Sequence, residues 1–248
     1  MNFIINSIGG IFYILFYSLF KRHNIGHKIE LTFHEIVRTG IESIGIVTIA
    51  SILCGLIAVF IIDQRLGSYI PEFYITEAIS KSVIIELGAL GASIALVGRV
   101  GTRITAEIAT MKVNEEIDAL ETMAIDPYDY LVYPKMMASL VSYPIMVVFS
   151  ELLIIFGAML FLVYIKGFGL KTFLFGIREH FRMLEFIQSL IKGAVFGLMS
   201  TSISCYFGIT ASKGAKGVGE ATTNAVVYSV VMIFLFDYII IRIFSLWL

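Results

Sequence analysis

The sequence predicts an all-α integral membrane protein. Of its 248 residues, 58% are hydrophobic and 15% are charged, and its mean hydropathy is +0.90. A soluble globule of this size needs more polar surface than this composition supplies. Ser43 to Ile62 and Gly193 to Ser212 are also runs of twenty residues without a charge. At ~1.5 Å per residue, such a run crosses a hydrocarbon layer of roughly 30 Å.

Five transmembrane spans are expected in a single domain that covers residues 1–248. They are placed at residues 41–62, 82–107, 136–165, 187–212 and 221–245. Three of these spans contain an isolated carboxylate, at Glu86, Glu151 or Asp237. Counting Lys and Arg with the amino terminus inside gives ten on the inner side and eight elsewhere, a small excess that favours this orientation.

Residues 1–38 are expected to form an interfacial helix and a cytoplasmic link. The stretch MNFIINSIGGIFYILFYSLF is apolar but contains Asn2, Asn6 and a pair of glycines, and KRHNIGHK follows it. A helix in the headgroup plane fits this pattern as well as a sixth span does, and we favour the interfacial helix. A signal peptide is not expected, because no positive charge precedes the apolar part.

Residues 113–126 are expected to form a short acidic helix outside the membrane. Apolar residues recur on one face at Val113, Ile117, Leu120 and Ala124. The remaining positions carry the acids Glu115, Glu116, Asp118 and Glu121. A helix this short is marginal in water unless it packs against something. The pattern alone leaves two interpretations open, packing on the chain's own membrane domain or docking in a groove of a cytoplasmic partner.

The carboxylate of Glu86 falls five residues into an apolar stretch. A charge at the middle of a membrane costs about 2.5 to 3.5 kcal/mol on insertion scales, so this carboxylate should be protonated, paired or facing a wet cavity. It serves either as a structural hydrogen-bonding group or as part of a substrate path.

The stretch after Glu86 combines small residues with charges. Gly88, Gly91, Ala95 and Gly98 recur at spacings of three and four and predict close helix approach. Arg99, Arg103 and Glu107 are each four apart, so Arg103 and Glu107 should pair. These three charges are expected to mark the inner membrane boundary.

Several functional classes are disfavoured. A net charge of −1 without a basic run argues against nucleic-acid binding. The isolated Cys54 and Cys205 lack CxxC spacing and are expected to be structural. The turn from Lys213 to Thr223 matches no phosphate-binding order. The four histidines fall outside the spans, so we expect no catalytic residue, no metal site and no cofactor.

Two blocks of the sequence resemble a known family. They are ELG…GRVGTRITAEIATMKVNEEIDALETMAIDPYDYLVYP, from Glu86 to Pro134, and GVGEATTNAVVYS, from Gly217 to Ser229 and followed by Asp237. They are similar to MlaE-type permeases, the membrane subunits of ABC systems that move phospholipids between the inner and outer membranes of diderm bacteria.

The resemblance implies a homodimer in the inner membrane, with an ABC ATPase subunit, an MCE-domain subunit and, in some members, a STAS-domain subunit. It implies that the acidic helix is a coupling helix that fits the ATPase. Its residues are Glu115, Glu116, Ile117, Leu120, Glu121 and Ala124. It implies a lipid cavity near Glu86, Leu87 and Leu90.

The sequence departs from the family pattern at two places. Many members have Arg-Glu-Leu-Gly-Pro, whereas this chain has Ile85 and Ala89 beside the Glu86 block, and Glu220 stands where an Arg is frequent. The leading hypothesis is an ABC permease subunit without enzymatic activity of its own. The alternative is an ion-coupled secondary transporter that uses intramembrane carboxylates, and an intramembrane enzyme is the third.

Overall fold

The computed structural model describes residues 2–20, 28–66 and 71–246, and this part of the chain is helical without a strand. The elements of the first half are α1 (Asn2–Phe20), α2 (Lys28–Thr39), η1 (Ile41–Ser43), α3 (Ile44–Leu66), α4 (Glu72–Ser82), η2 (Val83–Leu87), α5 (Gly88–Leu96), η3 (Val97–Gly101), α6 (Thr102–Val113) and α7 (Glu116–Thr122). Those of the second half are η4 (Tyr128–Val132), α8 (Tyr133–Met159), η5 (Leu160–Ile165), α9 (Leu170–His180), α10 (Met183–Ile209) and α11 (Ala215–Phe244). The segments η2 to η5 are π-helical, and η1 is a 3-10 turn.

Within the described ranges, five helical runs are long and apolar enough to cross a membrane, which confirms the predicted fold class. These runs are Lys28–Arg65, Phe73–Val113, Tyr128–Ile165, Met183–Ile209 and Ala215–Phe244. Most extend beyond the predicted spans, because short helices and π-helical turns continue them at their ends without a break.

The amino-terminal region contains two helices. The apolar part of α1, Gly9–Ser18, is shorter than the five candidate spans. Its Ile11 packs in a buried cluster with residues of α10 and α11, whereas Tyr13 is exposed. Helix α2 was not expected, because residues up to 38 were treated as a link; most of the basic cluster before it, residues 21–27, lies outside the described part of the chain.

The chain forms two compact units. Unit 1 comprises the described residues of 1–43, 96–143 and 194–248, and unit 2 comprises those of 44–95 and 144–193. Helices α5, α8 and α10 contain residues of both units, so the unit boundaries fall inside helices rather than in loops.

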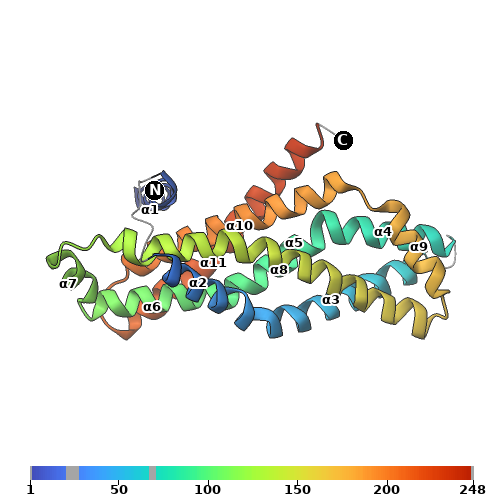
Figure 1. Cartoon of the computed structure of the whole chain (residues 1–248), viewed down its shortest axis with the longest axis horizontal. Helices are drawn as coiled ribbons and strands as arrows, with labels where there is room; N and C mark the ends of the chain where they lie inside the picture. The colour runs from blue at the N-terminus through green and yellow to red at the C-terminus, as the bar shows by residue number, and fades with distance from the viewer. Residues whose placement is uncertain (1, 21–27, 67–70, 247–248) are drawn as a thin grey trace. The chain divides into compact units, whose positions relative to one another are not determined.

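In unit 1, α6 and α11 pack side by side (Figure 1). Small side chains also bring α6 close to α10. A Cβ on Gly208 would lie 2.7 Å from the Ile108 side chain, and the hydroxyl of Thr105 donates to the carbonyl oxygen of Ser204 at 3.1 Å. The buried Thr105 hydroxyl thus finds a hydrogen-bond acceptor while α6 and α10 stay in close contact.

In unit 2, α3 and α8 touch through a reciprocal pair of glycines. A Cβ on Gly55 would lie 2.2 Å from the carbonyl oxygen of Ile154, and one on Gly157 would lie 2.5 Å from that of Ile52. Real Cβ atoms do not approach backbone this closely, so both positions require glycine. A hydrogen bond of 2.8 Å between the hydroxyls of Ser51 and Ser150 spans the same interface.

Within this single chain, Gly88, Gly91 and Gly98 make no close backbone contact with another described helix. A Cβ on Gly91 or Gly98 would meet no atom within 4 Å, and one on Gly88 would meet a side chain, Glu151. The close backbone approach therefore occurs between α3 and α8. It was missed because each of these helices contributes one glycine rather than a repeat.

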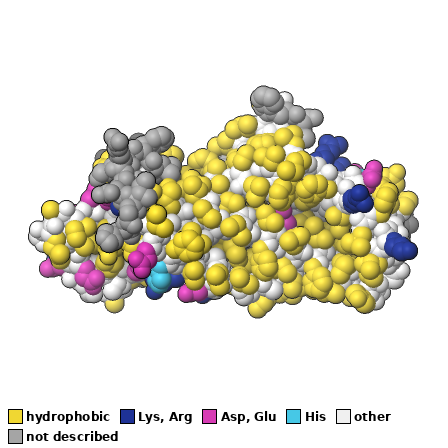
Figure 2. Space-filling model, in the orientation of Figure 1, with side chains coloured by type: hydrophobic (Ala, Val, Ile, Leu, Met, Phe, Trp, Pro, Cys, Tyr) yellow, Lys and Arg dark blue, Asp and Glu magenta, His cyan; other side chains and the backbone are white. Residues whose placement is uncertain are grey.

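Hydrophobic side chains cover most of the face seen in Figure 2. On α3 the exposed apolar residues repeat every four positions, with Ile49, Leu53 and Ile57 exposed by 65%, 51% and 58%. A surface this apolar is suited to lipid rather than water.

Replacing Gly157 with Ala should destabilise unit 2, because the new Cβ would press on backbone that cannot rotate away; overpacking of this kind costs about 1 to 3 kcal/mol. Thermal unfolding of the purified chain in detergent would show a lower melting temperature. Gly45→Ala is the matched control, since a Cβ there meets nothing within 4 Å, and equal melting temperatures for the two variants would contradict the predicted contact.

Candidate functional site

Helix α7 is shorter than predicted. It covers Glu116–Thr122 instead of residues 113–126, because the backbone turns into the left-handed region on both sides. Glu115 has φ of 62° and Ala124 has φ of 58°. Val113 consequently ends α6, and Ala124 lies beyond the helix. Such backbone is unusual for residues other than glycine and is found where surrounding structure imposes it.

The side chains of α7 divide into a buried contact and exposed acids. Ile117 is 3% exposed and holds the helix against the rest of unit 1, while Leu120 is half-buried. Glu116 and Glu121 are exposed, as is Glu115 just before the helix. Asp118 is occupied, since Lys112 of α6 donates to it at 2.7 Å.

The end of α7 is closed by a Schellman motif. The N–H of Ile125 donates to the carbonyl of Leu120 at 2.9 Å, and that of Ala124 to the carbonyl of Glu121 at 3.0 Å. This pattern places Ala124 at the position where glycine is usual. The chain therefore fixes the exit of α7 with a residue that disfavours the required conformation.

Glu86 is paired in unit 2 with a lysine from α10. The ammonium of Lys192 donates to Oε1 of Glu86 at 3.0 Å and to the carbonyl oxygen of Ile85 at 2.8 Å. Lys192 is fully buried, whereas 31% of the Glu86 side chain is exposed. Glu86 lies in η2, a π-helical turn in which the backbone hydrogen bonds span one residue more than in an α-helix. Lys192 thus supplies a positive charge that Ile85, at the usual arginine position, does not.

A polar strip on α10 runs along the same part of unit 2. Glu185, Gln188 and Ser189 are buried on the helix face that carries Lys192. Glu151 of α8 is also buried, with its side chain against the backbone of Gly88, and its Oε1 has no hydrogen-bond partner among the described residues. Buried carboxylates in spans are costly, and they usually mark functional positions.

Leu87 and Leu90 differ in their surroundings. Leu87 packs against the hydrophobic core of unit 2, which includes Val83 and Ile154. Leu90 is half-buried on α5. Their proximity to a lipid therefore stays a prediction.

The predicted boundary charges belong to a larger ion cluster in unit 1. Arg103 and Glu107 pair at 3.3 Å as their spacing predicted. Lys135 of α8 and Glu35 of α2 complete the cluster, with an Nζ to Oε1 distance of 2.7 Å. Arg99 lies apart from it and pairs with Glu42 at 3.5 Å. Sequence reasoning missed Glu35 and Lys135, because they lie 68 residues before Arg103 and 28 residues after Glu107.

Other residues noted in the sequence have simpler surroundings. Asp237 is buried in α11, and Glu220 lies 3.7 Å from Lys216 on the same helix. Cys205 is buried and Cys54 half-buried, both with free thiols. In the described ranges, no three His, Cys, Asp or Glu side chains gather as a possible metal site.

These features define a multi-pass α-helical membrane protein, with charges paired between helices and one short acidic helix between the second and third spans. The sequence model of the family described as Permease MlaE matches residues 32–243. The chain belongs to this family of ABC transporter permeases.

Individual relatives agree with this assignment. A "Probable ABC transporter permease protein" of Rickettsia felis is 34% identical over 216 residues, covering 87% of this chain and 83% of the relative. A protein of the same description from Synechocystis is 31% identical over 207 residues, or 84% and 79%. "Protein TRIGALACTOSYLDIACYLGLYCEROL 1, chloroplastic" of Arabidopsis thaliana is 30% identical over 209 residues, or 84% and 60%.

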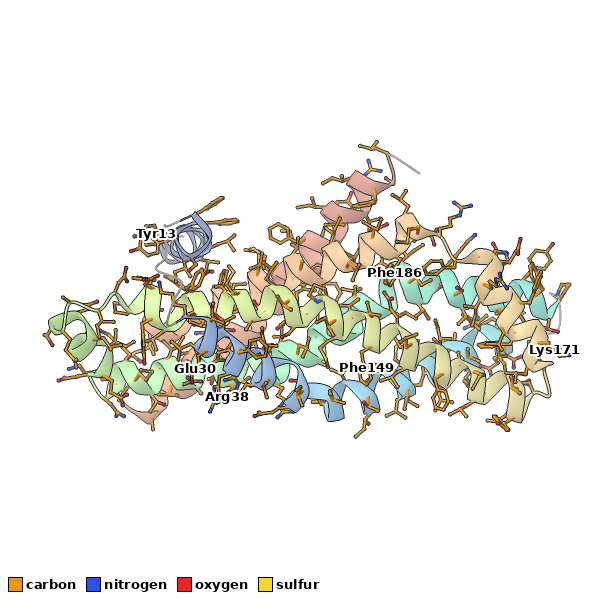
Figure 3. The ribbon with its side chains drawn as sticks, viewed as in Figure 1. Tyr13, Glu30, Arg38, Phe149, Lys171 and Phe186 are labelled. Atoms are coloured by element: carbon orange, nitrogen blue, oxygen red, sulfur yellow. The ribbon has the colours of Figure 1, made fainter. Side chains whose placement is uncertain are left out.

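Replacing Lys192 with Met should destabilise the chain, because it removes the buried ammonium that donates to the Glu86 carboxylate and the Ile85 carbonyl; losses of this type cost about 1 to 3 kcal/mol. Melting in detergent measures the effect. Lys171→Met is the control, since Lys171 is exposed on α9 (Figure 3). Adding Glu86→Gln to Lys192→Met should recover part of the loss, and no recovery would contradict the pairing.

Replacing Ala124 with Gly should stabilise the exit of α7, because glycine adopts positive φ without strain; the gain is about 1 kcal/mol. Hydrogen exchange at the amides of Met123 to Ile125 should become slower. Thr122→Gly is a control of opposite sign, since Thr122 lies inside α7. Faster exchange in Ala124→Gly would show that the left-handed geometry is absent.

Proposed function

We propose that this chain is the membrane subunit of an ABC transporter that moves phospholipids or related lipids between inner and outer membranes, driven by ATP hydrolysis on a separate subunit. The observation that carries the proposal is the family match over residues 32–243. That match includes both the Glu86 region and the acidic helix. No covalent chemistry by this chain is required.

Two observations support a lipid as the cargo. The Arabidopsis relative is named after a glycolipid, trigalactosyldiacylglycerol. In unit 2 the half-exposed Glu86 and the buried Lys192 form a polar site among apolar side chains, which suits a molecule with a polar head and apolar tails. We propose that Glu86, Leu87 and Leu90 line the lipid path, with Lys192 holding the Glu86 carboxylate in place.

Helix α7 is proposed as the coupling helix that docks into the ATPase on the cytoplasmic side. Its seven residues are too few for a stable isolated helix, and Ile117 anchors it to unit 1. Several other side chains on and beside α7 are available to contact a partner. These are Glu115, Glu116, Leu120, Glu121 and Ala124, of which Leu120 is half-buried and the others are exposed.

The remaining partners are proposed from the family. A second copy of the chain would form a homodimer, and α11 offers it an exposed apolar face. Residues on that face are Val227, Val231, Phe234 and Tyr238. An MCE-domain subunit would continue the lipid path outward, and a STAS-domain subunit would bind in some systems. The complex would reside in the inner membrane of a diderm bacterium.

The mechanism is a two-state one. ATP-driven closure of the ATPase subunits would displace α7, and the displacement would change the width of the lipid cavity. The ATPase can shift this equilibrium only to the extent that it contacts the two states differently. The attachment of α7 to the rest of unit 1 through the buried Ile117 allows force to pass.

The ion-coupled secondary transporter is the second candidate, and buried Glu151 with its unpartnered Oε1 favours it. Glu86→Gln and Glu151→Gln separate the two candidates in proteoliposomes. On the ABC proposal, lipid movement depends on ATP and needs no proton gradient. Movement driven by a pH gradient without ATP, and abolished by either variant, would replace the ABC proposal with the ion-coupled one.

The double variant Glu116→Lys/Glu121→Lys tests the docking role of α7. Both side chains are exposed, so folding should be unaffected, whereas reversing two charges at an interface should weaken ATPase binding by about tenfold or more. Co-purification of the ATPase with the tagged chain measures the loss. Thr172→Arg on α9 is the control, because Thr172 is also exposed. Unchanged association of the double variant would remove α7 from the interface.

A further inference from the structure

An ion pair joins α6 and α8, the helices that precede and follow α7 in the chain. Residues 102–143, which comprise α6, α7, η4 and the unit 1 part of α8, are called the coupling hairpin below. Lys135 of α8 donates to Oε1 of Glu107 of α6 at 3.0 Å, although 28 residues separate them. The two sides of the hairpin, α6 and α8, are therefore joined directly and not only through α7.

Helix α2 is bound to both sides of the hairpin through Glu35. Lys135 donates to Oε1 of Glu35 at 2.7 Å, and Arg103 donates to Oε2 at 3.0 Å. Arg103 also reaches Oε2 of Glu107 at 3.3 Å, and Arg38 of α2 lies 3.7 Å from the same oxygen. All four carboxylate oxygens of the two glutamates are thus paired. The ion cluster consists of Glu35, Arg38, Arg103, Glu107 and Lys135.

Burial makes this cluster hard to open. The side chains of Lys135 and Glu35 are 4% and 9% exposed, and separating them would leave a buried charge without compensation. The nearby pair of Arg99 and Glu42 is different, with exposures of 39% and 47%, so water can replace that contact at little cost. The buried cluster should stay closed while weaker contacts break.

A second attachment fixes the direction of α2. Lys28, at the start of α2, forms an ion pair with Asp129 of η4, and its ammonium lies 5.4 Å from the ring centroid of Tyr133. Lys28 and Glu35 are seven residues apart, or about 10 Å along a helix. A helix held at two points this far apart cannot pivot about either one. Glu30 and Arg38, which lie on α2 on either side of Glu35 in the sequence, are labelled in Figure 3.

We infer that α2 and the coupling hairpin move as one rigid body during transport, with Lys135 as the positioning residue that joins them. The inference rests on the proposed function, because it assumes that a partner ATPase displaces α7. On this inference, α2 is displaced together with α7. Helix α3, which continues the first candidate span after α2, begins five residues after α2 ends, so the movement passes into α3 as well as through α6 and α8.

Crosslinking tests whether α2 and the hairpin stay together. His34 of α2 and Tyr130 of η4 line one surface hollow, are both exposed, and lie outside the ion cluster. In a chain with Cys54→Ala and Cys205→Ala, the pair His34→Cys/Tyr130→Cys would be bridged with a short bismaleimide. The assay is ATP-driven movement of fluorescent phosphatidylethanolamine in proteoliposomes that contain the full complex. The control is His34→Cys alone, treated with the same reagent.

The bridged complex should retain transport within about twofold of the control, because a rigid body loses nothing when it is crosslinked. Arrest of transport in the bridged complex, with the control active, would overturn the inference by showing that α2 separates from the hairpin in the cycle.

Lys135→Met tests the positioning role directly. Co-purification of the ATPase should be unchanged, while lipid moved per ATP hydrolysed should fall about tenfold, because removing one member of a buried ion cluster frees the others. Lys135→Arg should restore this ratio within about threefold. Hydrogen exchange of the chain alone should rise in both α2 and the hairpin for Lys135→Met.

The outcomes separate the two proposals. If the unmodified complex does not bind the ATPase or move lipid with ATP, the proposed function fails. If it does both, and Lys135→Met keeps the ratio of lipid to ATP, only the rigid-body inference fails. If Lys135→Met does not fold, the crosslinked pair still decides the question.

Discussion

Charge pairing between helices, within segments that cross a membrane, is the interaction on which the rest of this structure depends. Lys192 and Lys135 are both buried, and each meets a carboxylate from a distant part of the chain. Because lipid offers no water to a stranded charge, each pair fixes which helices must be neighbours. Lys192 sets the position of Glu86 in unit 2. Lys135 sets the position of α2 against the segment that bears α7 in unit 1.

Local patterns in the sequence predicted much of the fold. Long apolar runs located the five spans, and the spacing of Arg103 and Glu107 predicted their ion pair. The sequence predicted that Glu86 is protonated, paired or facing a wet cavity, but it could not name a partner. Lys192 follows it by 106 residues, and no periodicity links positions that far apart. The ion cluster of unit 1 could not be predicted for the same reason, because its members are far apart in the sequence.

Other errors came from local backbone. The hydrophobic face at residues 113–124 predicted a longer helix, and side-chain spacing gives no sign that Glu115 and Ala124 adopt positive φ. Helix α2 was missed because charges interrupt it and it adjoins a basic cluster. The family resemblance predicted coupling residues on and beside α7, and the structure adds that Ile117 among them is buried while most others are exposed.

The burial of Lys192 also bears on how the protein is made. An unpaired lysine at the centre of a span opposes insertion by about 2.5 to 3.5 kcal/mol. Glu86 belongs to the second span and Lys192 to the fourth, so during synthesis the acceptor is threaded into the bilayer before its donor emerges. The fourth span thus enters a membrane that already holds its counter-ion, so its insertion can draw on a residue of the amino-terminal half.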